Sequence, residues 1–244
     1  MKIVVIGGTG RIGAQVVRLL AGHEVVAASP STGVNAVTGE GLSGVLRGAD
    51  VLVDVSNSPS FADDDVREFF QRTTGNLVRA AREAGVGHFV ALSVVGADEL
   101  PDSGYLRAKV AQEKLIRESG LAYTIVRATQ FFEFAAAIAD SSTVDGVVRL
   151  SDGGTQPIAA EDVAVVVAQA AGEPPVGGVV EIGGPDVLPM DEWIRRVLTA
   201  RKDPREVVTD PEATYFGAVL GKDSLVPAED AWRGKVGLAE WLSR

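Results

Sequence analysis

The first apolar segment of the chain is short, continuous and rich in β-branched residues. Lys2–Ile6 reads Lys-Ile-Val-Val-Ile and is followed by glycines, a pattern typical of a strand buried on both faces of a sheet. We expect it to be the central strand. Apolar residues then recur at helical spacing over residues 11–20, before Gly22, which predicts a helix packed on that strand.

Strands and helices continue to alternate through the first half of the chain. Further strands are predicted at Glu24–Ala28, Asp50–Val55, His88–Ser93 and Ala122–Arg127, and helices near residues 42–48, 62–84 and 104–119. This alternation predicts an α/β fold with a parallel, doubly wound sheet of the Rossmann type.

After Phe134 the pattern changes to shorter pieces. We predict strands at Gly146–Leu150, Gln156–Ala159 and Val179–Ile182, and helices at Glu161–Ala171 and Met190–Ala200. The expected organisation is a Rossmann core over residues 1–134 and a smaller C-terminal α/β lobe over residues 135–244, with elements partly interleaved between them. Trp193, Trp232 and Trp241 are expected to pack the lobe.

The composition of the chain excludes several kinds of site and segment. Of the 244 residues, 46% are hydrophobic and 23% charged, and there is no cysteine, which excludes disulfides, thiolate nucleophiles and cysteine metal sites. No apolar run approaches the roughly 20 residues that a membrane helix requires. Because the buried-strand pattern begins at once, over Met1 to Ile6, a signal peptide has no room, and we expect a cytoplasmic protein.

The formal charge of −10 disfavours binding to the phosphates of nucleic acids. The densest basic stretch, Arg195, Arg196, Arg201 and Lys202, is interpreted as a solvated helix face. We therefore expect a small molecule as the partner, with no nucleic acid and no membrane. The sequence leaves the oligomeric state open.

A glycine motif separates the first predicted strand from the first predicted helix. Gly7-Gly-Thr-Gly10-Arg-Ile-Gly13 has the context in which such a motif indicates a dinucleotide: a tight turn, close approach of backbone to a pyrophosphate, and close packing of helix on strand. The alternative is a glycine-rich turn without a ligand. The loop residues expected to contact the cofactor are Gly7, Thr9, Gly10, Arg11, Ile12 and Gly13.

The end of the second predicted strand bears on which dinucleotide binds. An NAD site would place a carboxylate there, but this chain has Ala28-Ser-Pro-Ser-Thr32. Ser29, Ser31 and Thr32 offer hydroxyl groups to a 2′-phosphate, although the usual arginine is missing from this segment. We expect NADP, with NAD as the alternative.

Three polar residues are expected to meet at the carboxyl edge of the sheet. Tyr105 and Lys109 are four residues apart on a predicted helix, which places them on one face, and Ser93 closes the preceding strand. A neighbouring ammonium favours the phenolate and would bring the pKa of the tyrosine nearer the working range. The alternative for Tyr105 is an exposed residue at a helix start.

These motifs together resemble the short-chain dehydrogenase/reductase superfamily, and more narrowly its atypical, NmrA-like NAD(P)H-binding branch. In that resemblance Gly7, Gly10 and Gly13 match the cofactor fingerprint, and Ser93, Tyr105 and Lys109 match the catalytic serine and the Tyr-x-x-x-Lys pair. The segments 127–133, 157–163 and 181–185 resemble later landmarks, the first of them lining the nicotinamide end. Ala128 and Thr129 are therefore expected to contact the cofactor.

The resemblance implies an oxidoreductase that transfers hydride from NAD(P)H to a carbonyl or quinone-type molecule. Tyr105 would donate the proton, Ser93 would hold the substrate oxygen, and Lys109 would hold the ribose and lower the pKa of the tyrosine. The alternative is a non-catalytic, NmrA-like sensor that binds the dinucleotide and signals to a partner protein. Ser56 and Asn57 would touch the cofactor or form a simple polar strand exit.

Other polar and aromatic residues are given structural roles. His23 and His88 are expected in turns, and the run Asp63–Asp65 is expected at a helix N-terminus. No metal site is predicted. Phe131, Phe132 and Phe134 are interpreted as core residues, with walls for a flat substrate as the alternative.

Overall fold

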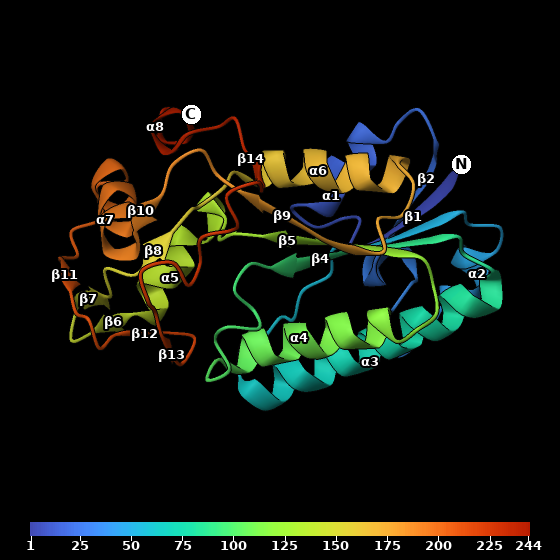
Figure 1. The fold of residues 1–244 in the computed structure, drawn as a ribbon, viewed down its shortest axis with the longest axis horizontal. Coiled ribbons are helices and arrows are strands. Elements are labelled where there is room, and N and C mark those ends of the chain that lie inside the picture. Colours follow the sequence, from blue (N-terminus) through green and yellow to red (C-terminus); the bar gives the residue numbers. More distant parts are fainter.

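The computed structural model describes residues 1–244 and has a seven-stranded parallel sheet at its centre (Figure 1). The strands lie in the order β14-β9-β5-β4-β3-β1-β2. Their bounds are β1 Lys2–Ile6, β2 Glu24–Ala28, β3 Val51–Asp54, β4 His88–Val94, β5 Tyr123–Ala128, β9 Gly178–Gly183 and β14 Trp232–Arg233. The predicted doubly wound α/β sheet is confirmed.

Helices cover both faces of this sheet. Figure 1 shows α1 (Gly13–Leu19) and α6 (Ala160–Gly172) on one face, and α3 (Asp63–Ala84) and α4 (Gly104–Arg117) on the other, where α2 (Leu42–Leu46) packs beside α3. Alternate side chains of β1 serve the two layers, because successive residues of a strand point to opposite faces. Ile3 and Val5 pack toward α1 and α6, whereas Val4 and Ile6 pack toward α2, α3 and α4.

A smaller group of elements lies at one end of the sheet (Figure 1). It contains α5 (Ala135–Ser141), α7 (Met190–Ala200), α8 (Leu238–Leu242), and short strands in three small sheets. The short strands are β6 Thr143–Val144, β7 Val147–Leu150, β8 Gly154–Thr155, β10 Leu188–Pro189, β11 Val207–Thr209, β12 Thr214–Tyr215 and β13 Ala218–Val219. Their core surrounds Trp193, which is fully buried against Phe132. The turns Pro30–Thr32 and Phe132–Phe134 are 3₁₀ helices.

Segments beyond residue 134 contribute to both parts of the molecule. Helix α6 and strands β9 and β14 return to the central sheet, whereas α5, α7 and α8 lie outside it. Trp232 therefore lies in the sheet, and the expectation that all three tryptophans pack the lobe is wrong for this one.

Two expectations about strands are wrong. β1 is the second strand from one edge, and β4 is central, because every strand after β2 is added on the side of β1 opposite to β2. The segment Gln156–Ala159 forms no strand and contributes only one bridge, between Ile158 and Phe131. Pro157 has no N–H group with which to continue a ladder.

His88 is also placed differently from the prediction. It begins β4 in register with Val51, and its ring is buried with Nε2 2.9 Å from Thr124 Oγ1. Burial lowers the pKa of His88. His23 is exposed and lies in a bend, as expected.

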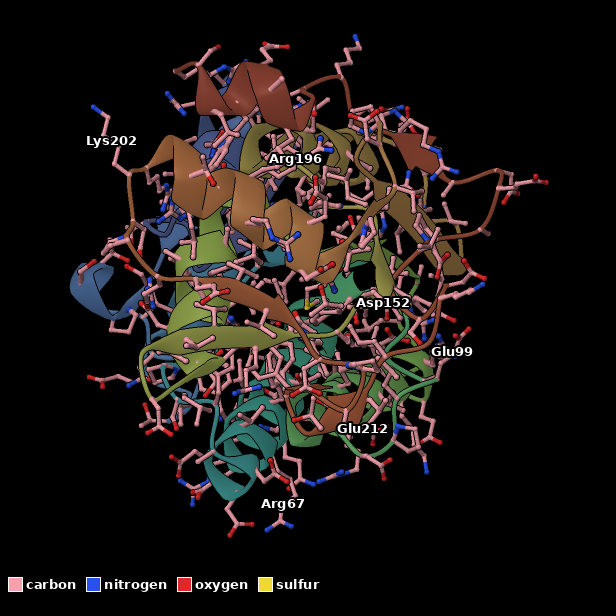
Figure 2. The ribbon with its side chains drawn as sticks, turned by 90° about the vertical axis from the view of Figure 1, so that its left-hand side faces the viewer. Arg67, Glu99, Asp152, Arg196, Lys202 and Glu212 are labelled. Atoms are coloured by element: carbon pink, nitrogen blue, oxygen red, sulfur yellow. The ribbon has the colours of Figure 1, made fainter.

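Two residues of the basic stretch, both within α7, form ion pairs with acidic neighbours, whereas Arg201 and Lys202, which follow the helix, form none. Arg195 pairs with Asp191 at 3.0 Å and with Glu192 at 2.9 Å, and Arg196 pairs with Glu192 at 2.8 Å. Figure 2 shows Arg196 and Lys202 on the outside of the molecule. None of the helices combines the length and the apolar character needed to cross a bilayer.

Candidate functional site

A cavity of about 1160 Å³ opens where the strands of the sheet end. Its walls include residues that follow the carboxyl ends of β1, β2, β3 and β5, and residues of β4 and α4. Strand order reverses between β1 and β3, the switch point at which open α/β sheets bind ligands. The predicted site residues that line it are Gly7, Thr9, Gly10, Arg11, Ile12, Gly13, Ser29, Ser56, Asn57, Ser93, Tyr105, Lys109, Ala128 and Thr129.

The glycine loop requires glycine at its two ends for different reasons. Gly7 has φ +78°, and a Cβ there would lie 3.1 Å from the backbone nitrogen of Ser56. A Cβ on Gly13 would overlap the carbonyl oxygen of Gly7. These contacts pack the start of α1 against the loop and leave the loop backbone on the cavity wall.

Several polar groups on the cavity wall have no partner within the protein. The main-chain N–H groups of Thr9, Arg11 and Ile12 donate no hydrogen bond. The buried amide of Gln130 makes no hydrogen bond of ordinary geometry through its nitrogen or its oxygen, although it lies near enough to the Tyr215 hydroxyl to act on the pKa of that group. Unpaired loop N–H groups suit a pyrophosphate, and an unpaired amide suits a polar group of a ligand. The residues present therefore fit a dinucleotide.

The turn after β2 offers fewer hydroxyl groups than expected. The Thr32 hydroxyl is used by the local backbone. It donates to the carbonyl oxygens of Ser29, at 3.0 Å, and Ala27, at 3.2 Å, and it accepts from the Ser29 N–H. Ser31 is exposed and does not line the cavity, although its Oγ lies 2.8 Å from Ser29 Oγ. Of the predicted hydroxyl groups, only that of Ser29 lies on the wall.

Arg11 supplies a positive charge that the segment after β2 lacks. Arg11 is exposed and lines the cavity, and the only other cationic residue in the wall is Lys109. A guanidinium group binds phosphate oxygens well because of its planar set of donors. A guanidinium group therefore lies on the cavity wall, at the glycine loop, although residues 28–32 contain no arginine.

Ser93, Tyr105 and Lys109 line the same cavity but form no hydrogen bond with one another. Ser93 Oγ donates to Glu113 Oε1 at 2.6 Å, and the Tyr105 hydroxyl donates to Asn57 Oδ1 at 3.3 Å. Lys109 Nζ donates to the Leu92 carbonyl oxygen at 2.9 Å and to Gln112.

The pKa of Tyr105 differs from the expectation. Burial raises it above the ordinary value, and a hydrogen bond to Asn57 offsets this only in part. The Lys109 ammonium does not lower it, because that group faces Leu92 and Gln112. At neutral pH the tyrosine is therefore a protonated phenol.

Lys109 is itself buried and carries one N–H beyond its two protein acceptors. Burial lowers its pKa to about 8, although the charges of Asp54 and Glu113 act in the opposite direction. The ammonium also lies 4.3 Å from the centre of the Phe70 ring. Gln112 connects it to Asp54, which accepts from Gln112 Nε2 at 3.1 Å.

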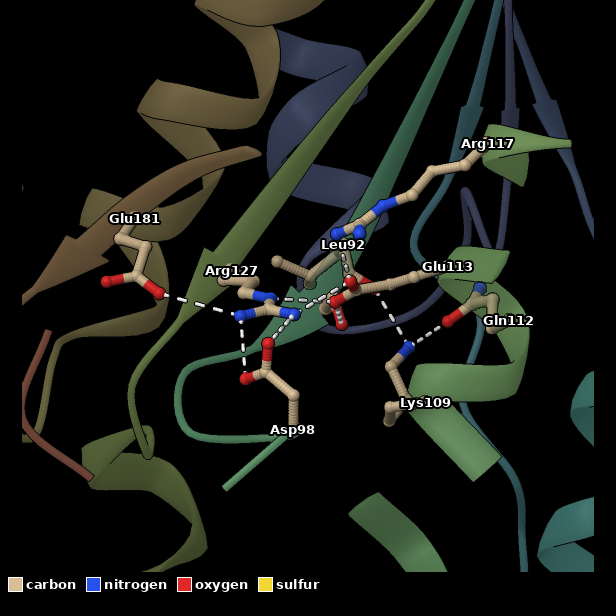
Figure 3. Close-up of polar contacts among 9 residues, drawn as sticks. Leu92, Asp98, Lys109, Gln112, Glu113, Arg117, Arg127 and Glu181 are labelled. Carbon is tan, nitrogen blue, oxygen red and sulfur yellow. Dashed lines mark hydrogen bonds and ion pairs between the residues drawn. The ribbon is translucent and has the colours of Figure 1, made fainter. Parts of the chain in front are cut away.

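An ionic cluster is centred on the buried Arg127 and Glu113 (Figure 3). Arg127, in β5, donates to both oxygens of Glu113 at 2.9 Å and to both oxygens of Asp98 at 3.0 and 3.1 Å, and Nη1 lies 3.8 Å from Glu181. The hydrogen bonds to Glu113 are the main cause that raises the pKa of Arg127. Glu113 was missed from the sequence, although it follows Lys109 by four residues on the same helix face.

Half of the fourteen aromatic residues of the chain line the cavity, and most were not predicted. They are Phe61, Phe69, Tyr105, Phe131, Phe134, Tyr215 and Phe216. Phe131 and Phe134 stack with ring centres 5.4 Å apart. The core interpretation holds for the buried Phe132 and in part for Phe131, which is half-buried and packs against the core beside α1 and α6, and it is wrong for the exposed Phe134. Tyr215 and Phe216 lie in the β12–β13 hairpin, for which the sequence gives no chemical motif.

The chain is similar to known proteins in sequence and in structure. A family model described as NAD(P)H-binding matches residues 7–174. The chain is 30% identical over 165 residues to the photosystem II assembly factor Ycf39 of Synechocystis sp., an alignment that covers 59% of this chain and 51% of the relative. It is also 30% identical over 205 residues to a (4-alkanoyl-5-oxo-2,5-dihydrofuran-3-yl)methyl phosphate reductase of Streptomyces griseus, covering 76% and 69%.

Among solved structures, an NADPH-dependent quinone oxidoreductase of Escherichia coli in complex with NADPH superposes with a TM-score of 0.75. Identity is 20%, and the alignment covers 99% of this chain and 98% of the other. The shared fold therefore extends over the whole chain. In sequence, the chain spans about half the length of the assembly factor that it matches.

Proposed function

Because the chain belongs to the NAD(P)H-binding family and has the fold of the short-chain dehydrogenase/reductase superfamily, we propose that it is a reductase acting on a carbonyl or quinone-type small molecule. One observation carries the proposal: the glycine loop and Tyr105 line the same cavity. A dinucleotide held at the loop and a substrate held at the tyrosine would therefore share one cavity.

The residues of the chain have separable roles in this reaction. The bound dinucleotide supplies the hydride. The unpaired N–H groups of Thr9, Arg11 and Ile12 hold the pyrophosphate, and the remaining N–H of Lys109 binds a ribose hydroxyl. Tyr105 transfers its hydroxyl hydrogen bond from Asn57 to the substrate oxygen and donates the proton.

Steady-state oxidation of NADPH with a panel of quinones and ketones tests the proposal. Tyr105→Phe keeps the ring but removes the proton, so turnover should fall by about 10²- to 10⁴-fold while the Kd for NADPH is unchanged. Tyr123→Phe is the matched control, because Tyr123 lies at the start of β5 and does not line the cavity. Turnover by Tyr105→Phe within a few-fold of the parent would reject the tyrosine as catalyst.

A non-catalytic, dinucleotide-binding regulator is the second candidate. It is favoured by the absence of hydrogen bonds among Ser93, Tyr105 and Lys109, and by the likeness to a protein named as an assembly factor. Tight NADPH binding with no oxidation across the whole panel would support this candidate against the reductase.

We infer further that NADPH is preferred over NADH. No carboxylate follows β2, and Ser29 and Arg11 lie on the wall where a 2′-phosphate would be recognised. Calorimetric titration should give the tighter Kd for NADPH. Ser29→Asp should shift preference toward NADH by repulsion, and Arg11→Ala should weaken NADPH alone. Equal affinities in the parent would contradict the inference.

A further inference from the structure

The hydroxyl group of Ser93 donates its hydrogen bond within the protein. Ser93 Oγ lies 2.6 Å from Glu113 Oε1, and both residues are 3% exposed. The same carboxyl group accepts from Arg127 Nε and Nη2 at 2.9 Å and from Arg117 Nη2 at 2.8 Å. Guanidinium groups never accept a hydrogen bond, so both oxygens of Glu113 act as acceptors toward the two arginines. The hydrogen between Ser93 and Glu113 therefore belongs to the serine.

A serine hydroxyl has one donor and two acceptor lone pairs. Ser93 lines the cavity, and with its donor bound to Glu113 the hydroxyl group has only its lone pairs left for a ligand bound there. A hydrogen bond to a carboxylate is roughly twice as strong as one to a neutral group, so a neutral carbonyl does not compete for this proton. The expected role of Ser93, holding a carbonyl oxygen, does not agree with this geometry.

We propose that Glu113 is a positioning residue that fixes Ser93 as a hydrogen-bond acceptor, and that Ser93 recognises the O–H group of a phenolic or alcoholic ligand. The ligand class rests on the proposed function, in which the hydroxyl-bearing compound is the reduced partner of the carbonyl. Donors for the carbonyl partner lie elsewhere on the wall, at Tyr105 and at the unpartnered amide of Gln130. The carbonyl partner would thus accept from Tyr105 and Gln130, and the hydroxyl partner would in addition donate to Ser93.

Two aromatic probes that differ only in the donor test the recognition. 2-Naphthol and 2-methoxynaphthalene are titrated calorimetrically into the protein saturated with NADP⁺, so that no turnover occurs. The parent should bind the naphthol more tightly, and Ser93→Ala should weaken naphthol by about fivefold, the size of one neutral hydrogen bond, without affecting the ether. Ser151→Ala, at a buried serine outside the cavity, should change neither affinity.

The infrared carbonyl stretch of bound 2-acetonaphthone tests the role of Glu113. Ser93→Ala should leave the frequency unchanged, because the serine donates nothing to the ketone. Glu113→Gln can donate its amide N–H to Ser93 Oγ and release the serine proton, so the stretch should shift to lower frequency. Adding Ser93→Ala to Glu113→Gln should abolish that shift. If Glu113→Gln does not fold, the carbonyl stretch in Ser93→Ala and the affinities of the two naphthalene probes still test the proposal.

Three results would overturn the proposal. They are an upward shift of the ketone stretch in Ser93→Ala, equal losses of both naphthalene probes in that variant, and no binding of either probe. All these readouts are independent of turnover. If the parent does not oxidise NADPH but Ser93→Ala removes the preference for naphthol, the proposed reductase activity is wrong and the recognition by Ser93 stands. If the parent oxidises NADPH but Ser93→Ala keeps the preference, the activity stands and the recognition by Ser93 is wrong.

Discussion

Gln130 is the residue whose chemistry is least satisfied in the protein alone. Its side chain is 6% exposed, and neither amide atom has a partner. A buried unsatisfied group of this kind costs about 1–3 kcal/mol, whereas an apolar group of similar shape avoids that cost. We expect Gln130→Met to raise the free energy of unfolding by about 1 kcal/mol in the absence of ligand, as measured by urea titration.

The same substitution should weaken the use of a carbonyl acceptor. In Gln130→Met the KM for the carbonyl acceptor should rise on the order of fivefold, because one hydrogen bond to the acceptor is lost. A destabilised variant with an unchanged KM would show that Gln130 serves packing and not ligand recognition.

Lys109 should give the stability of the protein a measurable pH dependence. Its pKa is lowered to about 8 in the folded protein, against about 10.4 for an unfolded chain. Between these values the unfolded chain binds more protons, so the free energy of unfolding should rise with pH. Urea unfolding from pH 7.5 to 9.5 should show this slope in the parent.

Two variants distinguish the contribution of Lys109 to this pH dependence from the contributions of other titrating groups. Lys109→Met should lose the slope, whereas Lys114→Met, at a lysine whose side chain is 70% exposed on the same helix, should keep it. Equal slopes in the parent and in Lys109→Met would mean that the buried lysine stays charged throughout the range.

At the scale of elements, the first half of the chain could be predicted closely from its sequence. The glycines, the β-branched runs and the i, i+4 spacing of Tyr105 and Lys109 are local patterns, and they fix the strands β1 to β5, the loop and the face of α4. The same spacing extended by one turn would have indicated Glu113. Its partner Arg127 lies one strand away, and pairing across strands leaves no local signature.

The aromatic wall could not be predicted for a related reason. Phe216 comes from a hairpin more than one hundred residues after Tyr105 in the chain, and the hairpin strands β12 and β13 are each two residues long. Such short strands have no periodicity to detect. Tertiary packing alone brings the two rings to 5.5 Å.

The β12–β13 hairpin should control access of aromatic acceptors to Tyr105. The Phe216 ring packs on Tyr105 at 5.5 Å and on Phe61 at 5.1 Å, and its backbone has φ +47°. Phe216→Ala should raise the KM for an aromatic quinone by about two- to tenfold, the worth of one aromatic pair, with the Kd for NADPH unchanged. Val219→Ala, on the exposed side of the hairpin, is the control. An equal change in both variants would contradict a specific role for the ring.

At the scale of the whole molecule, Asp162 joins the C-terminal segment to the core. This buried residue in the first turn of α6 accepts the main-chain N–H groups of Lys235 at 2.9 Å and Val236 at 3.0 Å. Asp162→Ala leaves both donors without a partner and should lower the free energy of unfolding by about 2–4 kcal/mol. Asp162→Asn keeps an acceptor oxygen and should lower it less.

Glu161→Ala is the neighbouring control in the same urea titrations. Glu161 pairs with Arg244 at 2.5 Å, but both side chains are nearly half exposed, and such surface pairs contribute little. A loss equal to that of Asp162→Ala would show that helix α6, and not the C-terminal anchor, is what the substitutions weaken.

The purely parallel pairing of the central sheet also has a consequence for how the chain folds. Each pairing joins segments separated by a crossover, and even β1 and β2 pair Lys2 with Glu24. No hairpin can nucleate this sheet, so its formation waits on the closure of loops of about twenty residues or more, and high contact order slows folding. Since the cavity takes its walls from the ends of these same strands, the ability to bind a ligand should emerge only in the slowest refolding phase.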